Sequence, residues 1–192
     1  MISKHRVPIR FVLWFVWVLC MGPAGCGTGV RPDADPFPLK VSGIRKLADG
    51  FRFTEGPAAD GEGNIYFTDI PNNRILRWSP DGQIRTFLEN SGGANGLLFD
   101  KEGNLIACAG GIGKLVSIDP TGTITVLADT YEGKPFNSPN DLWIDGKGGI
   151  YFTDPRYGHR ETLPQDGEHV YYLSPNRKKL IRVIDDLVRP NG

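Results

Sequence analysis

The chain has 192 residues, which is enough for one sizeable domain. Its 22 Lys and Arg residues balance its 22 Asp and Glu residues, and no basic tract occurs. This balance excludes the electrostatic footprint expected of a nucleic-acid-binding protein. The 25 glycines and 15 prolines together favour a turn-rich, all-β protein.

The first 25 residues have the pattern of a secretory signal peptide. Lys4, Arg6 and Arg10 give a positive start, and an apolar run of 11 residues follows at 11–21. A membrane-spanning helix needs about 20 such residues, so this run predicts an export signal. Small residues then precede Cys26, as in a bacterial lipobox. We expect a periplasmic or extracytoplasmic protein, with Cys26 either a lipid anchor to the membrane or incidental in a secreted chain.

Residues 26–38 are rich in Gly, Pro and Asp without an apolar period, which predicts a flexible tether. We expect the folded domain to cover residues 39–192, with a first strand in residues 41–51. Cys108 lies in an apolar run and has no second cysteine in the domain, so it is expected to be a small buried core residue.

One sequence pattern then occurs three times, over residues 55–89, 95–129 and 140–186. Each repeat places four short strands around turns such as Asp-Gly-Glu-Gly-Asn at 60–64. The starts, taken at 55, 95, 140 and 191, are 40, 45 and 51 residues apart. Four-stranded repeats of about 40–50 residues are typical of β-propeller blades, and no helical period of 3.6 occurs.

We therefore predict an all-β propeller of four-stranded blades, with about three blades and the start of a fourth. A closed propeller needs roughly 4–8 blades. The sequence thus indicates either the amino-terminal portion of a longer protein or a small protein that closes by self-association.

A polar residue recurs at the start of the innermost strand of each repeat: Glu55, Asn95, Asn140 and Asn191. Equivalent inner positions of a propeller surround its axis, so these side chains are expected to meet. One carboxylate and several amide oxygens, without His or Cys, suit Ca²⁺ better than zinc or copper. Asn also caps turns, so a purely structural role is the alternative for Asn95 and Asn140.

Other polar residues have weaker signals. Asp141, beside Asn140, is a candidate catalytic or substrate-facing acid, with turn capping as its alternative. Asp69 and Asp154 end two YFTD strands, and this recurrence favours a structural role. The candidate substrate contacts are Asn95, Asn140, Arg156, Tyr157 and His159, and a solvated loop is the alternative for the last three. The aromatic residues expected in the core between blades are Tyr66, Phe67, Trp78, Trp143, Tyr151 and Phe152.

The motifs TEGPAAD…GNIYFTDIPNNRILRW, NSPNDLWID…GGIYFTDPRYG and RPNG resemble the gluconolactonase branch of the SMP-30/gluconolactonase/LRE superfamily of six-bladed propellers. The resemblance covers residues 45–192. It implies a divalent cation, usually calcium, on the propeller axis, with Glu55, Asn140 and Asn191 at the positions of its ligands. It also implies an aspartate ligand in a later blade, for which residues up to Gly192 offer no counterpart.

The resemblance further implies a metal-dependent hydrolase that opens a sugar lactone, with the cation polarising the ester carbonyl. The expected partner is a small lactone or sugar, and the sequence gives no signal of a protein partner. The alternatives are a non-catalytic propeller that binds a sugar or a protein, an arylesterase-like enzyme, and an inactive truncated fragment. The chain has no Gly-X-Ser-X-Gly motif, which argues against a serine esterase.

Overall fold

The computed structural model describes residues 43–158 and 161–192. All of its strands lie in the unit Arg45–Gly192. The predicted signal peptide at 1–25, Cys26 and the predicted tether at 26–38 lie outside the described residues. Within the described ranges, no helix has the length and apolar character to cross a membrane.

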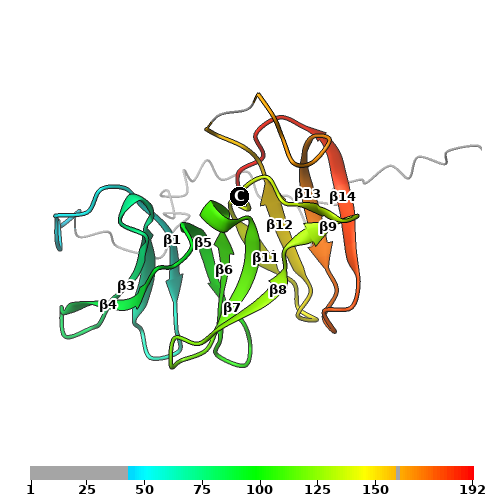
Figure 1. The fold of residues 1–192 in the computed structure, drawn as a ribbon. Coiled ribbons are helices and arrows are strands. Elements are labelled where there is room, and N and C mark those ends of the chain that lie inside the picture. Colours follow the sequence, from blue (N-terminus) through cyan, green and yellow to red (C-terminus); the bar gives the residue numbers. More distant parts are fainter. Residues whose placement is uncertain (1–42, 159–160) are drawn as a thin grey trace, which may run out of the picture. The chain divides into compact units, whose positions relative to one another are not determined.

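Three four-stranded antiparallel sheets follow one another along the chain (Figure 1). The first contains β1 (Thr54–Ala59), β2 (Ile65–Asp69), β3 (Arg74–Trp78) and β4 (Ile84–Glu89). The second contains β5 (Ala94–Phe99), β6 (Leu105–Ala109), β7 (Lys114–Ile118) and β8 (Ile124–Ala128). The third contains β11 (Leu142–Ile144), β12 (Ile150–Asp154), β13 (Glu168–Leu173) and β14 (Leu180–Leu187).

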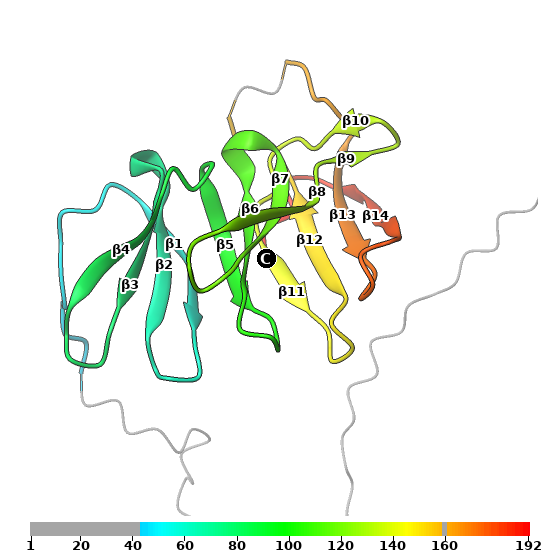
Figure 2. The same cartoon turned by 60° about the horizontal axis from the view of Figure 1, so that its bottom comes forward.

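Short elements connect these strands. Two 3₁₀ turns, η1 (Ile70–Asn72) and η2 (Gly110–Ile112), follow β2 and β6. A small hairpin of β9 (Thr130–Tyr131) and β10 (Lys134–Pro135) lies between the second and third sheets in sequence. Strands within each sheet pair in chain order, and the sheets lie side by side like blades (Figure 2). The prediction of an all-β fold built from four-stranded blades is confirmed.

The polar turns explain why each first hairpin forms. The Asp60 Oδ1 atom accepts the backbone N–H groups of Glu62 and Asn64, both at 2.9 Å. Asp100 and Asp145 bind the backbone of their own turns in the same way. Such side-chain bonds offer the turn backbone its partners and fix where the strand reverses.

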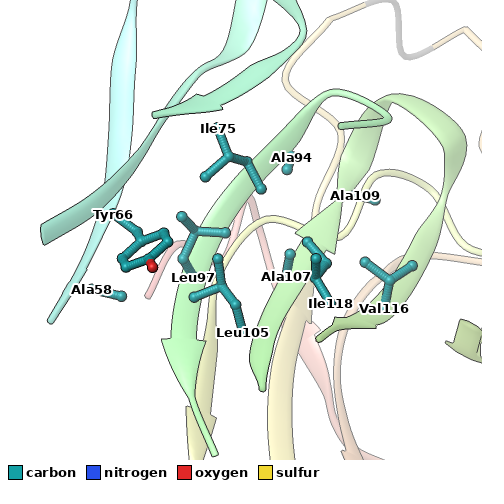
Figure 3. Packing of buried hydrophobic residues seen from close by; sticks show 10 residues of the cluster. All are labelled: Ala58, Tyr66, Ile75, Ala94, Leu97, Leu105, Ala107, Ala109, Val116 and Ile118. Atoms are coloured by element: carbon teal, nitrogen blue, oxygen red, sulfur yellow. The ribbon is translucent and has the colours of Figure 1, made fainter. Parts of the chain in front are cut away.

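The core fills the spaces between neighbouring sheets. β6 is buried at all five positions, because its alternate side chains face the two neighbouring sheets. Leu105, Ala107 and Ala109 pack towards the first sheet, beside Tyr66 and Ile75 (Figure 3). The opposite side chains of β6 join a second cluster with the third sheet: Ile106 and Cys108. The prediction that the cysteine is buried in the core is thus confirmed, and burial raises the pKa of its thiol.

Two predictions are wrong. Residues 43–51, the described part of the expected first strand, form no strand. A strand needs a hydrogen-bonded neighbour, and β1 to β4 pair among themselves. Trp143 and Tyr151 were expected in the core but are 65% and 39% exposed. They pair with each other across β11 and β12, on the face opposite Leu142 and Phe152, which pack in the cluster shared with the second sheet.

Candidate functional site

The recurring polar residues come together in space. Glu55, Asn95, Asn140 and Asn191, named the ring residues below, line one cavity of about 130 Å³ together with Asp141. Each ring residue comes from a different repeat. The C-terminal residue beside Asn191 lies close to the second and third sheets in both views (Figures 1 and 2). The predicted meeting of equivalent inner positions is therefore observed in the structure.

Two innermost strands carry an irregularity where they deliver their ring residue. The β1–β2 register shifts between Glu55 and Ala58, and the β5–β6 register shifts between Ala94 and Leu97. A bulge of this kind turns a side chain away from the regular alternation of a strand and is frequent beside active sites. The motifs Glu-Gly-Pro and Ala-Asn-Gly supply the small residues that such a bend requires.

Two glycines let the innermost strands approach each other closely. Gly56 has a φ of +53°, and a Cβ atom there would overlap the carbonyl oxygen of Asn95. A Cβ atom on Gly96 would overlap the Oδ1 atom of Asp141. Larger residues at these two positions would therefore push the blades apart and widen the cavity.

Hydrogen bonds join the backbones of neighbouring ring residues. The Thr68 hydroxyl lies 3.1 Å from the Glu55 carbonyl oxygen and 3.2 Å from the Asn95 carbonyl oxygen. The Gly96 N–H group donates to the Asn140 carbonyl oxygen at 2.8 Å. The side-chain oxygens of the ring residues are thus held on a backbone that is continuous from blade to blade.

Asp141 makes a local capping bond and also lies beside the ring residues. Its Oδ1 atom accepts the N–H group of Leu142 at 2.8 Å, which is a capping bond. Its side chain nevertheless lines the cavity with the ring residues. Its Oδ2 atom lies 3.8 Å from the place where a Cβ atom on Gly192 would stand.

The donor set of the cavity fits a hard cation. Its side chains offer carboxylate oxygens from Glu55 and Asp141 and amide oxygens from three asparagines. Among residues 43–158 and 161–192, no three His, Cys, Asp or Glu side chains gather in a metal-binding group. Oxygen donors of mixed charge suit Ca²⁺, which accepts six to eight oxygens in loose geometry.

A wider groove of about 440 Å³ adjoins the cavity and shares Asn95 and Asn140 with it. Ser138, Arg156 and Tyr157 line its sides. The structure therefore brings Tyr157 near the ring residues, whereas the predicted contact His159 lies outside the described residues. A larger cavity of about 610 Å³ opens between the first two sheets near their turns, and none of the predicted site residues lines it.

Asp69 fixes the segment that leads into β1. This fully buried carboxylate accepts the N–H groups of Arg52 and Phe53 through Oδ1, at 3.1 and 3.3 Å. Asn72 and Arg74 donate to its Oδ2 atom at 2.7 and 2.9 Å. Burial raises its pKa, but these hydrogen bonds outweigh burial and lower the pKa to about 2.

Asp154 does the same for the segment that leads to Asn140. It is fully buried and accepts the N–H groups of Asn137 and Ser138 at 2.9 and 2.7 Å. Burial raises its pKa to about 6, with a further rise from the nearby Glu168, and the hydrogen bonds only partly oppose this rise. The predicted structural role of both aspartates is confirmed.

Sequence reasoning missed two residues of the same kind. The Asn73 Oδ1 atom accepts the N–H group of Gly93, 20 residues away, at 2.8 Å. The Glu168 Oε2 atom accepts the N–H group of Arg189, 21 residues away, at 2.8 Å. Asn73 has a φ of +53°, which Asn tolerates better than most residues, and that preference was the available signal. For Glu168 no local pattern exists, because its partners are distant in sequence.

Comparisons with known proteins agree with this geometry. Residues 53–192 match the SMP-30/Gluconolactonase/LRE-like region. A gluconolactonase of Zymomonas mobilis is 35% identical over 170 residues, which cover 78% of this chain and 47% of that protein. A gluconolactonase structure from Xanthomonas campestris has a TM-score of 0.69 and 31% identity, over 72% of this chain and 50% of that one.

A further crystal structure, of a candidate gluconolactonase, has a TM-score of 0.72 and 38% identity, over 77% of this chain and 54% of that one. The chain spans about half the length of these relatives. The family match extends over all three sheets and every ring residue. The chain belongs to the SMP-30/gluconolactonase/LRE-like family.

Proposed function

We propose that the protein is a metal-dependent hydrolase that opens a sugar lactone to an aldonic acid. The observation that carries this proposal is the single cavity lined by Glu55, Asn95, Asn140 and Asn191 beside Asp141. The relatives named gluconolactonase support the choice of a lactone as substrate. A small substrate also suits the groove of about 440 Å³ that adjoins the cavity.

Glu55, Asn140 and Asn191 would hold the cation, with Ca²⁺ as the preferred ion because the donors are all oxygens. When bound, the cation polarises the ester carbonyl and stabilises negative charge on its oxygen. Asn95 and Asn140 lie at the junction of cavity and groove, where their amides would orient the lactone ring. Tyr157 would bound the groove on one side, and His159 stays a proposed substrate contact.

Asp141 would take the proton from the attacking water. Its Oδ1 atom is held by the Leu142 N–H group, which leaves Oδ2 for this purpose. Water adds to the carbonyl carbon, the ring C–O bond breaks, and the proton held by Asp141 passes to the ring oxygen, which leaves as a hydroxyl. Glu55 would serve as a ligand, because a carboxylate that coordinates a cation is a weak base.

The test is Glu55→Gln in the full-length protein, with Glu102→Gln as its control. Glu102 lies exposed on the turn of the second sheet, so its substitution removes the same charge far from the ring residues. We expect Glu55→Gln to lose calcium binding, measured by titration calorimetry, together with hydrolysis of glucono-1,5-lactone. Calcium affinity and rate that equal those of the Glu102→Gln control would refute the assignment. Cation binding without turnover in the unsubstituted protein would favour a non-catalytic sugar- or protein-binding propeller.

We also propose export across the cytoplasmic membrane, with lipidation at Cys26. The support is the basic start, the short apolar run and the small residues before Cys26. Cell fractionation with radiolabelled palmitate tests this proposal: label on the protein that disappears in Cys26→Ala supports the anchor. Unlabelled protein in the periplasmic fraction would support simple secretion instead.

A further inference from the structure

The ring residues share a feature that is separate from their own side chains. In each case, the backbone N–H group two residues earlier donates to a side-chain oxygen. The four bonds are Phe53 N to Asp69 Oδ1 at 3.3 Å, Gly93 N to Asn73 Oδ1 at 2.8 Å, Ser138 N to Asp154 Oδ1 at 2.7 Å, and Arg189 N to Glu168 Oε2 at 2.8 Å. We call Asp69, Asn73, Asp154 and Glu168 the anchor residues.

The anchor residues do not arise from one repeated sequence position. Asp69 and Asp154 end β2 and β12, whereas the equivalent residue at the end of β6 is Ala109. The anchor for the second sheet is Asn73, which lies between η1 and β3, and the anchor before Asn191 is Glu168, which starts β13. Three residue types from three kinds of location thus bind the same backbone position. What the four bonds have in common is that each one fixes the backbone two residues before a ring residue.

Each ring residue has backbone support in addition to its own side chain. Glu55 and Asn95 lie within the paired strands β1 and β5, and the Asn140 N–H group bonds to the Thr153 carbonyl oxygen at 2.9 Å. For Asn191, the structure shows hydrogen bonds to the two residues just before it, Arg189 and Pro190. The residues just before Asn191 therefore carry the support that the structure describes for it.

Those residues are held by Glu168 and Tyr157. The buried Glu168 carboxylate accepts the Arg156 N–H group through Oε1 and the Arg189 N–H group through Oε2, both at 2.8 Å. The Tyr157 hydroxyl lies 3.2 Å from the Arg189 carbonyl oxygen, to which it donates. Arg189 has a φ of +52°, a left-handed conformation that a non-glycine residue keeps only where its surroundings impose it.

We propose that Glu168 is a positioning residue that fixes Asn191 for cation binding, and that Tyr157 supports the same backbone segment. This inference rests on the proposed cation site. Loss of the partners that orient a metal ligand typically lowers metal affinity by about 10- to 100-fold. Glu168→Gln keeps one acceptor oxygen but replaces the other with an NH₂ group. It can therefore accept the N–H group of Arg156 or of Arg189, but not both.

The experiment measures Ca²⁺ affinity of the full chain by calorimetry for four variants. Glu168→Gln is expected to weaken binding by about 10-fold or more, and Tyr157→Phe by a few-fold. Tyr157 is exposed, so its variant should fold even if Glu168→Gln does not. The control is Tyr172→Phe, which removes a hydroxyl bonded to Asp145 at 3.2 Å, in a turn that lines neither the cavity nor the groove. Glu55→Gln, which removes one proposed cation ligand, shows the affinity expected when the cation site itself is damaged.

The outcomes separate this inference from the proposed function. Weaker calcium binding in Glu168→Gln and Tyr157→Phe, with an unchanged affinity in Tyr172→Phe, supports the positioning role. A role in fold stability alone would lower the calcium-free melting temperature and leave the affinity unchanged. Unaltered affinity in both variants, while Glu55→Gln loses binding, overturns the inference and retains the cation site. Absence of calcium binding by the unsubstituted chain rejects both.

Discussion

The pentapeptide Ile-Tyr-Phe-Thr-Asp occurs twice, as β2 and β12, and its two copies have opposite surroundings. Tyr66 of the first copy is 7% exposed and meets the rings of Phe87 and Phe99 edge-on, at 5.0 Å each. Tyr151 of the second copy is 39% exposed and packs at 4.6 Å on Tyr172 of its own sheet. Both tyrosines face in the same direction along the row of sheets, and only Tyr66 has a described sheet on that side.

The phenylalanines of the two copies show the reverse. Phe152 is 1% exposed and contacts Phe136 and Tyr171 between the second and third sheets. Phe67 is only partly buried and contacts Phe51 at 5.4 Å. The five residues therefore determine which side chain faces which side of a sheet, whereas the neighbouring sheet determines how much of it is buried.

The largest expected effect comes from the two phenylalanines. Phe152→Ala should lower the free energy of unfolding by about 3–5 kcal/mol, because it leaves a cavity in a packed aromatic cluster. Phe67→Ala should cost roughly 1–2 kcal/mol, since its ring is already partly in water. Urea denaturation of both variants measures the difference. Equal losses would mean that the strand sequence, and not the neighbouring sheet, sets the contribution.

The two aspartates should give opposite dependences of stability on pH. The pKa of Asp69 is lowered to about 2, against about 4 in an unfolded chain, so its contribution is present above pH 4 and lost as pH falls towards 2. The pKa of Asp154 is raised to about 6, so its protonated form favours folding. Stability should therefore fall as pH rises from about 4 to 6, by about 3 kcal/mol.

Melting temperatures recorded from pH 2 to 7 check this pair. Asp154→Asn should remove the decline in stability between pH 4 and 6. It should leave unchanged the loss of stability below pH 4, which is called the acid limb below. Asp69→Asn should flatten the limb below pH 4 instead. A decline between pH 4 and 6 that persists in Asp154→Asn would assign it to another group.

A smaller effect should follow from Arg74→Gln. Arg74 donates to Asp69 at 2.9 Å, and its side chain is 27% exposed, so solvent screens part of the attraction. We expect a loss of about 1 kcal/mol, because Asn72 and two backbone N–H groups still hold the carboxylate. The acid limb of the stability profile should move to higher pH. An acid limb at its original position would show that Arg74 contributes little to the charge of Asp69.

The repeat pattern predicted the sheets because turn and strand residues act locally. Asp60 binds backbone N–H groups no more than four residues away, so its role can be predicted from the residues beside it in the sequence. The coincidence of Glu55 with the asparagines was also predictable, since equivalent positions of a repeated unit occupy equivalent places. The anchoring by Asn73 and Glu168 was not, because each bond joins residues about 20 positions apart. The exposure of Trp143 depends on which sheet lies beside it, which its own strand does not encode.

The Thr68 hydroxyl carries one proton but lies within reach of the carbonyl oxygens of both Glu55 and Asn95. Because Thr68 is fully buried, separating the two inner strands would remove its hydroxyl from one of its two acceptors without replacing that contact by water. The inner edges of the first two sheets should consequently open together, as one cooperative unit of hydrogen exchange. Slow amide exchange would then extend as a continuous band across β1 and β5, and a displacement of one inner strand would also move the ring residue of the other.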